Sequence, residues 1–112
     1  MRLAIPVSEG QLDPHFGHCR YFALVDVEPA DKEIKETTMV EAPPHEPGVL
    51  PAWLAEQGAN LVLAGGMGSR AIQLFVDQGI EVIVGAPRLD PQSLVKSWLA
   101  GEIGAGANAC DH

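Results

Sequence analysis

The first forty residues contain three segments whose apolar patterns are typical of β-strands. Alternation over residues 2–7 predicts a first strand. Residues 21–27 are apolar on both faces and predict a strand that is buried on both sides, and residues 34–40 predict a weaker third strand. Because Pro6 lacks a backbone N–H, the first strand must end there or lose one partner. The short connections predict antiparallel pairing of these three strands.

From residue 48 onward the apolar period changes to that of a helix. Leu50, Trp53 and Leu54 lie at i, i+3 and i+4, and Gly58 provides a C-terminal stop, so a first helix should begin near residue 48 or 49. Ser69 is expected to cap a second helix that ends at Gly79 and has Ile72, Phe75 and Val76 on its apolar face. Asp90 is expected to cap a third helix with Pro91 in its first position, and the apolar face of that helix consists of Leu94, Val95, Trp98 and Leu99.

Short apolar runs at 61–64 and 81–84 predict two buried strands between these helices. The order of elements is therefore β-β-β-α-β-α-β-α. Its second half is a series of β-α units, which require a parallel sheet with right-handed crossovers. The pattern thus predicts an α/β protein with a mixed five-stranded sheet flanked by helices. Trp53, Phe75 and Trp98 are expected to belong to its core.

The 112 residues suffice for one domain, which we assign to residues 1–100, with a flexible Gly-rich tail over 101–112. No apolar run approaches the roughly 20 residues that span a bilayer, and no secretory signal is present, so we expect a cytoplasmic protein without a membrane partner. Its net charge of −8 and scattered basic residues disfavour nucleic-acid binding. Seven acidic residues lie between Asp26 and Glu46 and are expected to form a solvated surface, with an acidic docking patch as the alternative.

The segment His15-Phe16-Gly17-His18-Cys19 concentrates two imidazoles and one thiol in the loop after the first strand. Imidazole and thiolate are borderline-to-soft donors that suit Cu, Zn or Fe–S chemistry. The spacing does not provide the two separated ligand pairs of a structural zinc site. The incomplete set therefore indicates a site that receives a metal species, while hydrogen-bonding surface histidines and a small buried cysteine remain the alternative.

Gly65-Gly66-Met67-Gly68-Ser69 joins a predicted buried strand to a predicted helix. Glycines permit positive φ, and successive amides at a helix N-terminus can form an anion-binding concavity. Ala71 breaks the dinucleotide-binding pattern, and no Lys follows the glycines as a phosphate-binding loop requires. A tight strand–helix turn without a ligand is the alternative.

Three further donors lie elsewhere in the chain. His45 stands in a proline-stiffened segment before the first helix, where a solvent-exposed loop histidine is the alternative. Cys110 and His112 form a C-x-H pair on the predicted tail. Whether that tail reaches the site is left open by the sequence.

Two kinds of catalysis lack the residues they need. Two-metal hydrolysis requires clustered carboxylates, but the first strand has none and the two short later strands offer only Glu81. A Cys19 nucleophile would need His15 or His18 as its base, and neighbouring positions in sequence rarely give the required geometry. A hydrolase is therefore disfavoured, and a thiol-dependent enzyme stays open as the weaker alternative.

His15-Phe16-Gly17-His18, the Gly-Gly-x-Gly turn at 65–68, and Gly79-Ile80-x-Val82 with Gly85 together resemble the dinitrogenase iron–molybdenum cofactor biosynthesis domain family, and the resemblance covers essentially the whole chain. It implies a ribonuclease H-like fold without nuclease carboxylates and a carrier of a preformed metal–sulfur cluster in nitrogen fixation or related metabolism. The protein that it implies is therefore not an enzyme. The cluster is iron–molybdenum cofactor-like or, as in the similar orange-protein branch, a molybdenum–copper sulfide.

The resemblance also implies one site in which the first and fourth strands are neighbours. His15–Cys19 would line one wall of a crevice and Gly65–Ser69 the other. The implied metal ligands are His15, His18, Cys19 and His45, with Cys110 and His112 as additional candidates, and the position of Cys19 is variable in such proteins. The partners would be the cluster and the proteins that donate or accept it. A metal-free adaptor that binds a protein through its acidic segment is the alternative function.

Overall fold

The computed structural model describes residues 1–13, 19–28, 30–43 and 48–103. Its elements confirm the predicted α/β class and the order of the predicted strands and helices. The strands are β1 (Arg2–Ser8), β2 (Gln11–Leu12), β3 (Tyr21–Glu28), β4 (Glu33–Glu41), β5 (Leu61–Leu63) and β6 (Glu81–Ile83), and the helices are α1 (Val49–Glu56), α2 (Ser69–Asp77) and α3 (Pro91–Leu99).

The sheet has six strands, one more than the pattern predicts. The additional strand, β2, pairs with the end of β1 in a hairpin that places Val7 opposite Leu12. Glu9 and Gly10 form its turn with φ values of 52° and 78°, the left-handed conformation of both central residues in a two-residue hairpin turn. A two-residue strand is too short to show an apolar period, which is why this segment reads as a polar loop.

The strand order is β4-β3-β1-β5-β6. The pairs β1–β3 and β3–β4 are antiparallel, as predicted, whereas β1–β5 and β5–β6 are parallel. The predicted adjacency of the first and fourth long strands is thereby confirmed. The β1–β5 pairing reaches only Ala4, so Pro6 lies where β1 has already lost its partner on that side.

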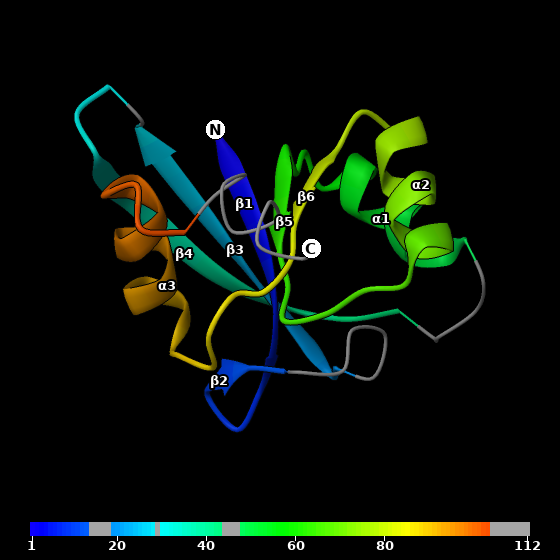
Figure 1. Ribbon diagram of the computed structural model, residues 1–112, viewed down its shortest axis with the longest axis horizontal. Helices are drawn as coiled ribbons and strands as arrows, with labels where there is room; N and C mark the ends of the chain where they lie inside the picture. The colour runs from blue at the N-terminus through cyan, green and yellow to red at the C-terminus, as the bar shows by residue number, and fades with distance from the viewer. Residues whose placement is uncertain (14–18, 29, 44–47, 104–112) are drawn as a thin grey trace.

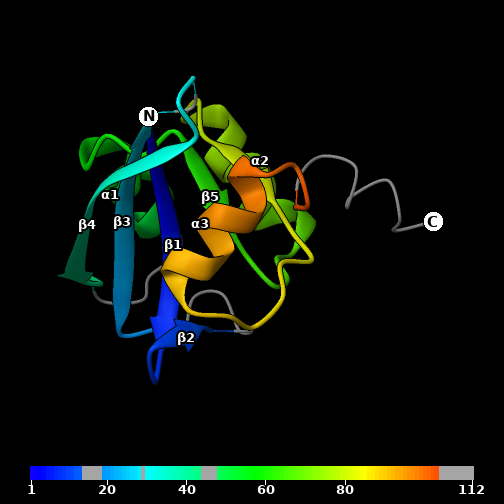
Figure 2. The same cartoon turned by 90° about the vertical axis from the view of Figure 1, so that its left-hand side faces the viewer.

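The sheet lies between α3 on one face and α1 with α2 on the other (Figure 1). In Figure 2, α3 lies in front of the sheet and α1 behind it. Side chains alternate between two clusters: Leu3 and Ile5 pack towards α3, whereas Ala4 packs towards α1 and α2. Phe75 is fully buried, but Trp53 and Trp98, which we also expected in the core, are only partly buried at its margins. No described helix is both long and apolar enough to cross a membrane.

The helix ends differ from prediction at α2. Gly68 rather than Ser69 is the N-cap residue, with φ −66° and ψ 151°, and no side chain caps this helix. Ser69 is instead the first helical residue. Val76, predicted on the buried face, is 53% exposed, because Phe75 is the residue that α2 buries in the core. Asp90 caps α3 as predicted, by accepting a hydrogen bond from the backbone N–H of Ser93.

The packed part of the chain continues beyond the end of α3. Ile103 is buried and belongs to the cluster beneath α3, although we assigned it to the tail. Residues 104–112 lie outside the described residues, so the predicted tail is untested beyond this point.

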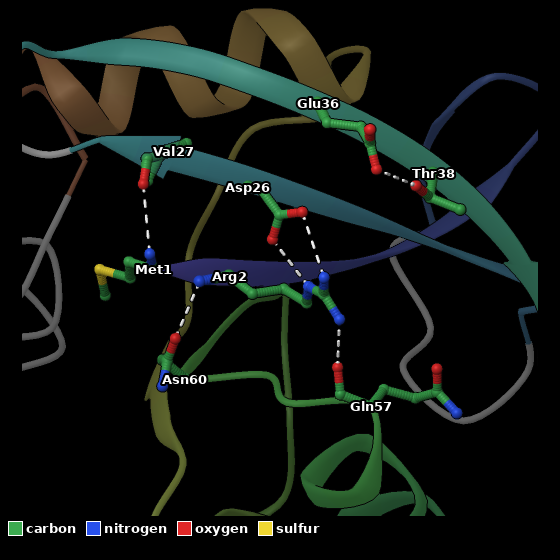
Figure 3. A network of polar contacts seen from close by, with 8 residues as sticks. All are labelled: Met1, Arg2, Asp26, Val27, Glu36, Thr38, Gln57 and Asn60. Atoms are coloured by element: carbon green, nitrogen blue, oxygen red, sulfur yellow. Dashed lines mark hydrogen bonds and ion pairs between the residues drawn. The ribbon is translucent and has the colours of Figure 1, made fainter.

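Arg2, at the beginning of β1, bonds to residues of three neighbouring segments (Figure 3). Its guanidinium binds both carboxylate oxygens of Asp26 on β3, at 2.7 and 3.1 Å, and donates to the carbonyl of Gln57 after α1. Its backbone N–H donates to the side chain of Asn60 at 2.8 Å. This one residue therefore connects β1, β3, α1 and the start of β5.

The stability of the fold should depend on pH through Asp26. The hydrogen bonds from Arg2 lower the pKa of Asp26 below its ordinary value, against the opposing effect of burial. Because the unfolded chain then binds more protons, the stabilisation is complete above the unfolded pKa of about 4 and is lost as pH falls through the folded pKa. Urea unfolding of wild-type protein between about pH 5 and pH 3 should therefore show a steeper loss of free energy than the Asp26→Asn variant. Equal pH dependence of the two proteins would contradict this assignment.

Candidate functional site

A topological switch point lies between β1 and β5. The chain leaves β1 towards β3 on one side of the sheet and leaves β5 through α2 towards β6 on the other. Ligands of open α/β sheets bind at the carboxyl ends of two strands whose connections diverge in this way. We call residues 9–13, 19–20 and 64–69, which follow β1 and β5, the switch-point edge. It forms the lower edge of the molecule in Figure 1.

The structure describes the end of one predicted wall and the whole of the other. Cys19 belongs to the cluster beneath α1 and α2, which also contains Ala64 and has Met67 packed against it. Cys19 of one predicted wall and Met67 of the other thus pack into or against the same core cluster, and the crevice between the two walls stays a prediction. His15, Phe16, Gly17, His18, His45, Cys110 and His112 lie outside the described residues.

Of the predicted metal ligands, only Cys19 lies within the described residues. All four histidines of the chain lie outside the described residues. Within residues 1–13, 19–28, 30–43 and 48–103, no three His, Cys, Asp or Glu side chains are grouped so that they could hold a metal ion. The assignment of His15, His18, Cys19 and His45 as ligands therefore stays a prediction.

Cys19 is fully buried rather than presented to solvent. Burial, reinforced by the negative charge of Asp13, raises the pKa of Cys19 to about 11. The thiol is therefore protonated at neutral pH, whereas nucleophiles and metal ligands require the thiolate. This environment weighs against Cys19 as the nucleophile of a thiol-dependent enzyme.

Asp13 is a feature of the site that sequence reasoning missed. It is only 7% exposed, and its backbone N–H donates to the carbonyl of Pro6 at 2.9 Å. Asp13 and Cys19 thus stand at the two ends of the segment 14–18, both buried against the end of β1. A buried carboxylate close in sequence to His15 is the kind of group that orients a ligating imidazole. The sequence offers only its position between Leu12 and Pro14 as a signal.

The glycine turn does not need glycine for its backbone. Glycines permit positive φ, but Gly65, Gly66 and Gly68 all lie outside the left-handed region. A Cβ atom added at Gly66 or Gly68 would meet no atom within 4 Å. The methyl group of an alanine would therefore fit at both positions. What glycine preserves here is open space next to the backbone, which a ligand could approach closely.

The two helices behind this turn begin without side-chain caps. Gly48 is the N-cap residue of α1 and Gly68 that of α2, and neither helix has a side-chain cap. Since α1 ends beside Arg2 at the opposite edge of the sheet, it begins on the side of the switch-point edge. Uncapped N-terminal amides carry partial positive charge and donate to anions. Electrostatically, this corner suits an anionic ligand.

Comparison with known sequences gives a family match over nearly the whole chain. Residues 1–101 match the family described as dinitrogenase iron-molybdenum cofactor. An uncharacterized protein of Methanocaldococcus jannaschii, MJ0580, is 35% identical over 107 residues, which covers 92% of this chain and 89% of that protein.

Solved structures agree with this match. The crystal structure of PH0822 superposes with a TM-score of 0.84 at 32% identity, and the alignment covers 100% of both chains. The apo form of the orange protein from Desulfovibrio gigas gives a TM-score of 0.75 at 26% identity, covering 92% of this chain and 90% of that one. The similarity thus includes both β1 and the glycine turn. The α/β fold is shared, whereas the ribonuclease H-like label stays a prediction.

Proposed function

We propose that this chain, which belongs to the dinitrogenase iron–molybdenum cofactor family, binds a preformed metal–sulfur cluster at its switch-point edge. The cluster is cargo that the protein receives and passes on, so no reaction is assigned to the protein. His15–Cys19 would form one wall of the site and Gly65–Ser69 the other. Iron–molybdenum–sulfur and molybdenum–copper–sulfur clusters are the two candidates, and the similarity to the orange protein is the reason to test the second.

The sterically open glycine turn is the observation that carries this proposal. Gly66 and Gly68 leave the backbone amides accessible, and α2 begins directly behind them without a cap. Metal–sulfur clusters of these types are generally anionic, whereas the chain has a net charge of −8. Salt screens distant charges beyond about 8 Å, so attraction has to come from groups at the site. Backbone amides provide such attraction without a charged side chain.

Direct bonds to metal would come from imidazoles. We propose His15, His18 and His45 as the ligands, with the buried Cys19 ranked below them and Cys110 and His112 as additional donors. Neutral imidazole binds copper and iron at physiological pH without the deprotonation that a thiol requires. Proteins that donate or accept the cluster would be the partners, and the cytoplasm, where thiols stay reduced, the location.

Metal analysis of protein purified anaerobically from its native host tests this function. We expect molybdenum and sulfide together with iron or copper, and charge-transfer absorption in the visible range. A colourless, metal-free product that also fails to take up tetrathiomolybdate, with or without copper(I), would overturn the proposal. That result would instead favour the adaptor hypothesis for the acidic segment 26–46.

A further inference from the structure

The segment that follows β6 connects the two sides of the switch-point edge. The backbone N–H of Gly85 donates to the carbonyl of Gly65 at 3.0 Å, and that of Ala86 donates to Ala64 at 3.0 Å. On the other side, the backbone N–H of Leu12 donates to the carbonyl of Leu89 at 2.9 Å. We call residues 85–89 the bridging segment. It is bonded both to the glycine turn and to β2, which leads to Asp13 and the His/Cys loop.

Arg88 stands inside this segment, between its two anchoring bonds. Its described charged partner is Glu9, at 3.7 Å from Nη2 to Oε2, and the two side chains are 46% and 87% exposed. An exposed pair at that distance contributes little and can be displaced by a stronger anion. Arg2, by contrast, is held by both oxygens of Asp26 at the opposite edge of the sheet. The guanidinium of Arg88 is therefore available at the switch-point edge.

The acidic groups near Arg88 differ in how readily they can pair with its guanidinium. Asp90 is engaged as the cap of α3 through the backbone and hydroxyl of Ser93, and Asp13 is buried. Glu9 is the exposed carboxylate that competes directly for Arg88. Arginine presents several N–H donors in a planar fork, which suits oxo- or sulfido-anions better than a point charge does.

We propose that the bridging segment is a third wall of the site and that Arg88 recognises the negative charge of the metal–sulfur cargo. This inference rests on the function proposed above. It adds a residue that neither the His/Cys motif nor the glycine turn contains. It also helps to explain how a chain of net charge −8 can attract an anion at one edge: the attraction is local and comes from Arg88 together with the uncapped amides of α2, to which the exposed Arg20 and Arg70 add positive charge.

Binding of tetrathiomolybdate, measured by anaerobic equilibrium dialysis, tests the role of Arg88. The Arg88→Gln variant should raise the dissociation constant about three- to tenfold, as expected for loss of one charge-assisted contact at a partly exposed site. Arg88→Lys should fall between the two, because lysine keeps the charge and loses the fork. Glu9→Gln should have the opposite effect and tighten binding, because it releases Arg88 from its competitor.

Lys96→Gln is the matched control. It removes the same charge, but from the far part of α3, where Lys96 lines a groove with Lys32 and Ile34. The dissociation constant of this variant should stay within about twofold of wild type, because salt screens the interaction between this distant charge and the probe. If wild-type protein binds the probe and Arg88→Gln binds equally well, or no worse than Lys96→Gln, this inference alone is overturned. If wild-type protein does not bind the probe, the proposed function fails and the inference fails with it.

Discussion

The His15→Ala/His18→Ala double variant is expected to lose the metal–sulfur cluster on anaerobic reconstitution. Removing even an outer partner of a metal ligand typically weakens binding by about 10- to 100-fold, so removing two direct ligands should do at least as much. The charge-transfer absorption of the wild-type protein should disappear, and the molybdenum bound per chain should fall to background. Absorption spectra and metal analysis of the same samples measure both effects.

A folding control is needed for this double variant, and the chain provides a ligand control as well. Substitutions away from a packed core usually change the free energy of unfolding by less than about 0.5 kcal/mol, and urea unfolding of the apo variant beside wild type measures whether the double variant keeps its fold. His112→Ala removes an imidazole near the C-terminus, and retained cluster in that variant would exclude His112 as an essential donor. Full cluster retention by the double variant would refute the proposed ligand set.

The Gly66→Ala/Gly68→Ala double variant should separate stability from binding. Both glycines lie outside the left-handed region and a Cβ atom at either would meet open space. At Gly66 the change to alanine should stabilise by about 0.4–1 kcal/mol, because the unfolded chain loses freedom. Gly68 is the N-cap residue of α2, where alanine is less favourable than glycine by about 1 kcal/mol, so the two effects should nearly cancel and the double variant should be about as stable as wild type. If the cluster approaches this backbone, two methyl groups in its place should weaken tetrathiomolybdate binding by tenfold or more, about 1.4 kcal/mol.

Gly79→Ala is the control with the opposite expected pattern. Gly79 follows α2 at the end remote from the turn and has a φ of 80°, which costs a non-glycine residue roughly 1–2 kcal/mol. It should lower the free energy of unfolding and leave binding unchanged. Urea unfolding and equilibrium dialysis on both variants measure the two effects independently. Unaltered binding by the Gly66/Gly68 variant would remove the glycine turn from the site.

The candidate site was predictable from sequence only in part. The His/Cys loop and glycine turn were recognisable because they are contiguous motifs with unusual composition. Asp13 and Arg88 were not, because each gains its meaning from a non-local contact: Asp13 from burial against the end of β1, and Arg88 from hydrogen bonds that tie its segment to Gly65 and Leu12. The structure also shows that the positive φ which glycine permits is not used in this turn, and that Gly66 and Gly68 leave open space beside the backbone.

The sequence by itself determined the α/β class, the succession of strands and helices, and the caps that need only a few residues, such as Asp90 at α3. These follow from apolar period and local hydrogen bonding, which act over a few positions. Only the tertiary structure decided that β2 is a strand, that Ser69 caps nothing, and that Cys19 is a buried thiol of raised pKa. It also decided that residues 85–89 are hydrogen-bonded both to the glycine turn and to β2. Burial, pKa and backbone bonds between distant segments depend on which surfaces meet when the sheet assembles, and no local pattern contains that information.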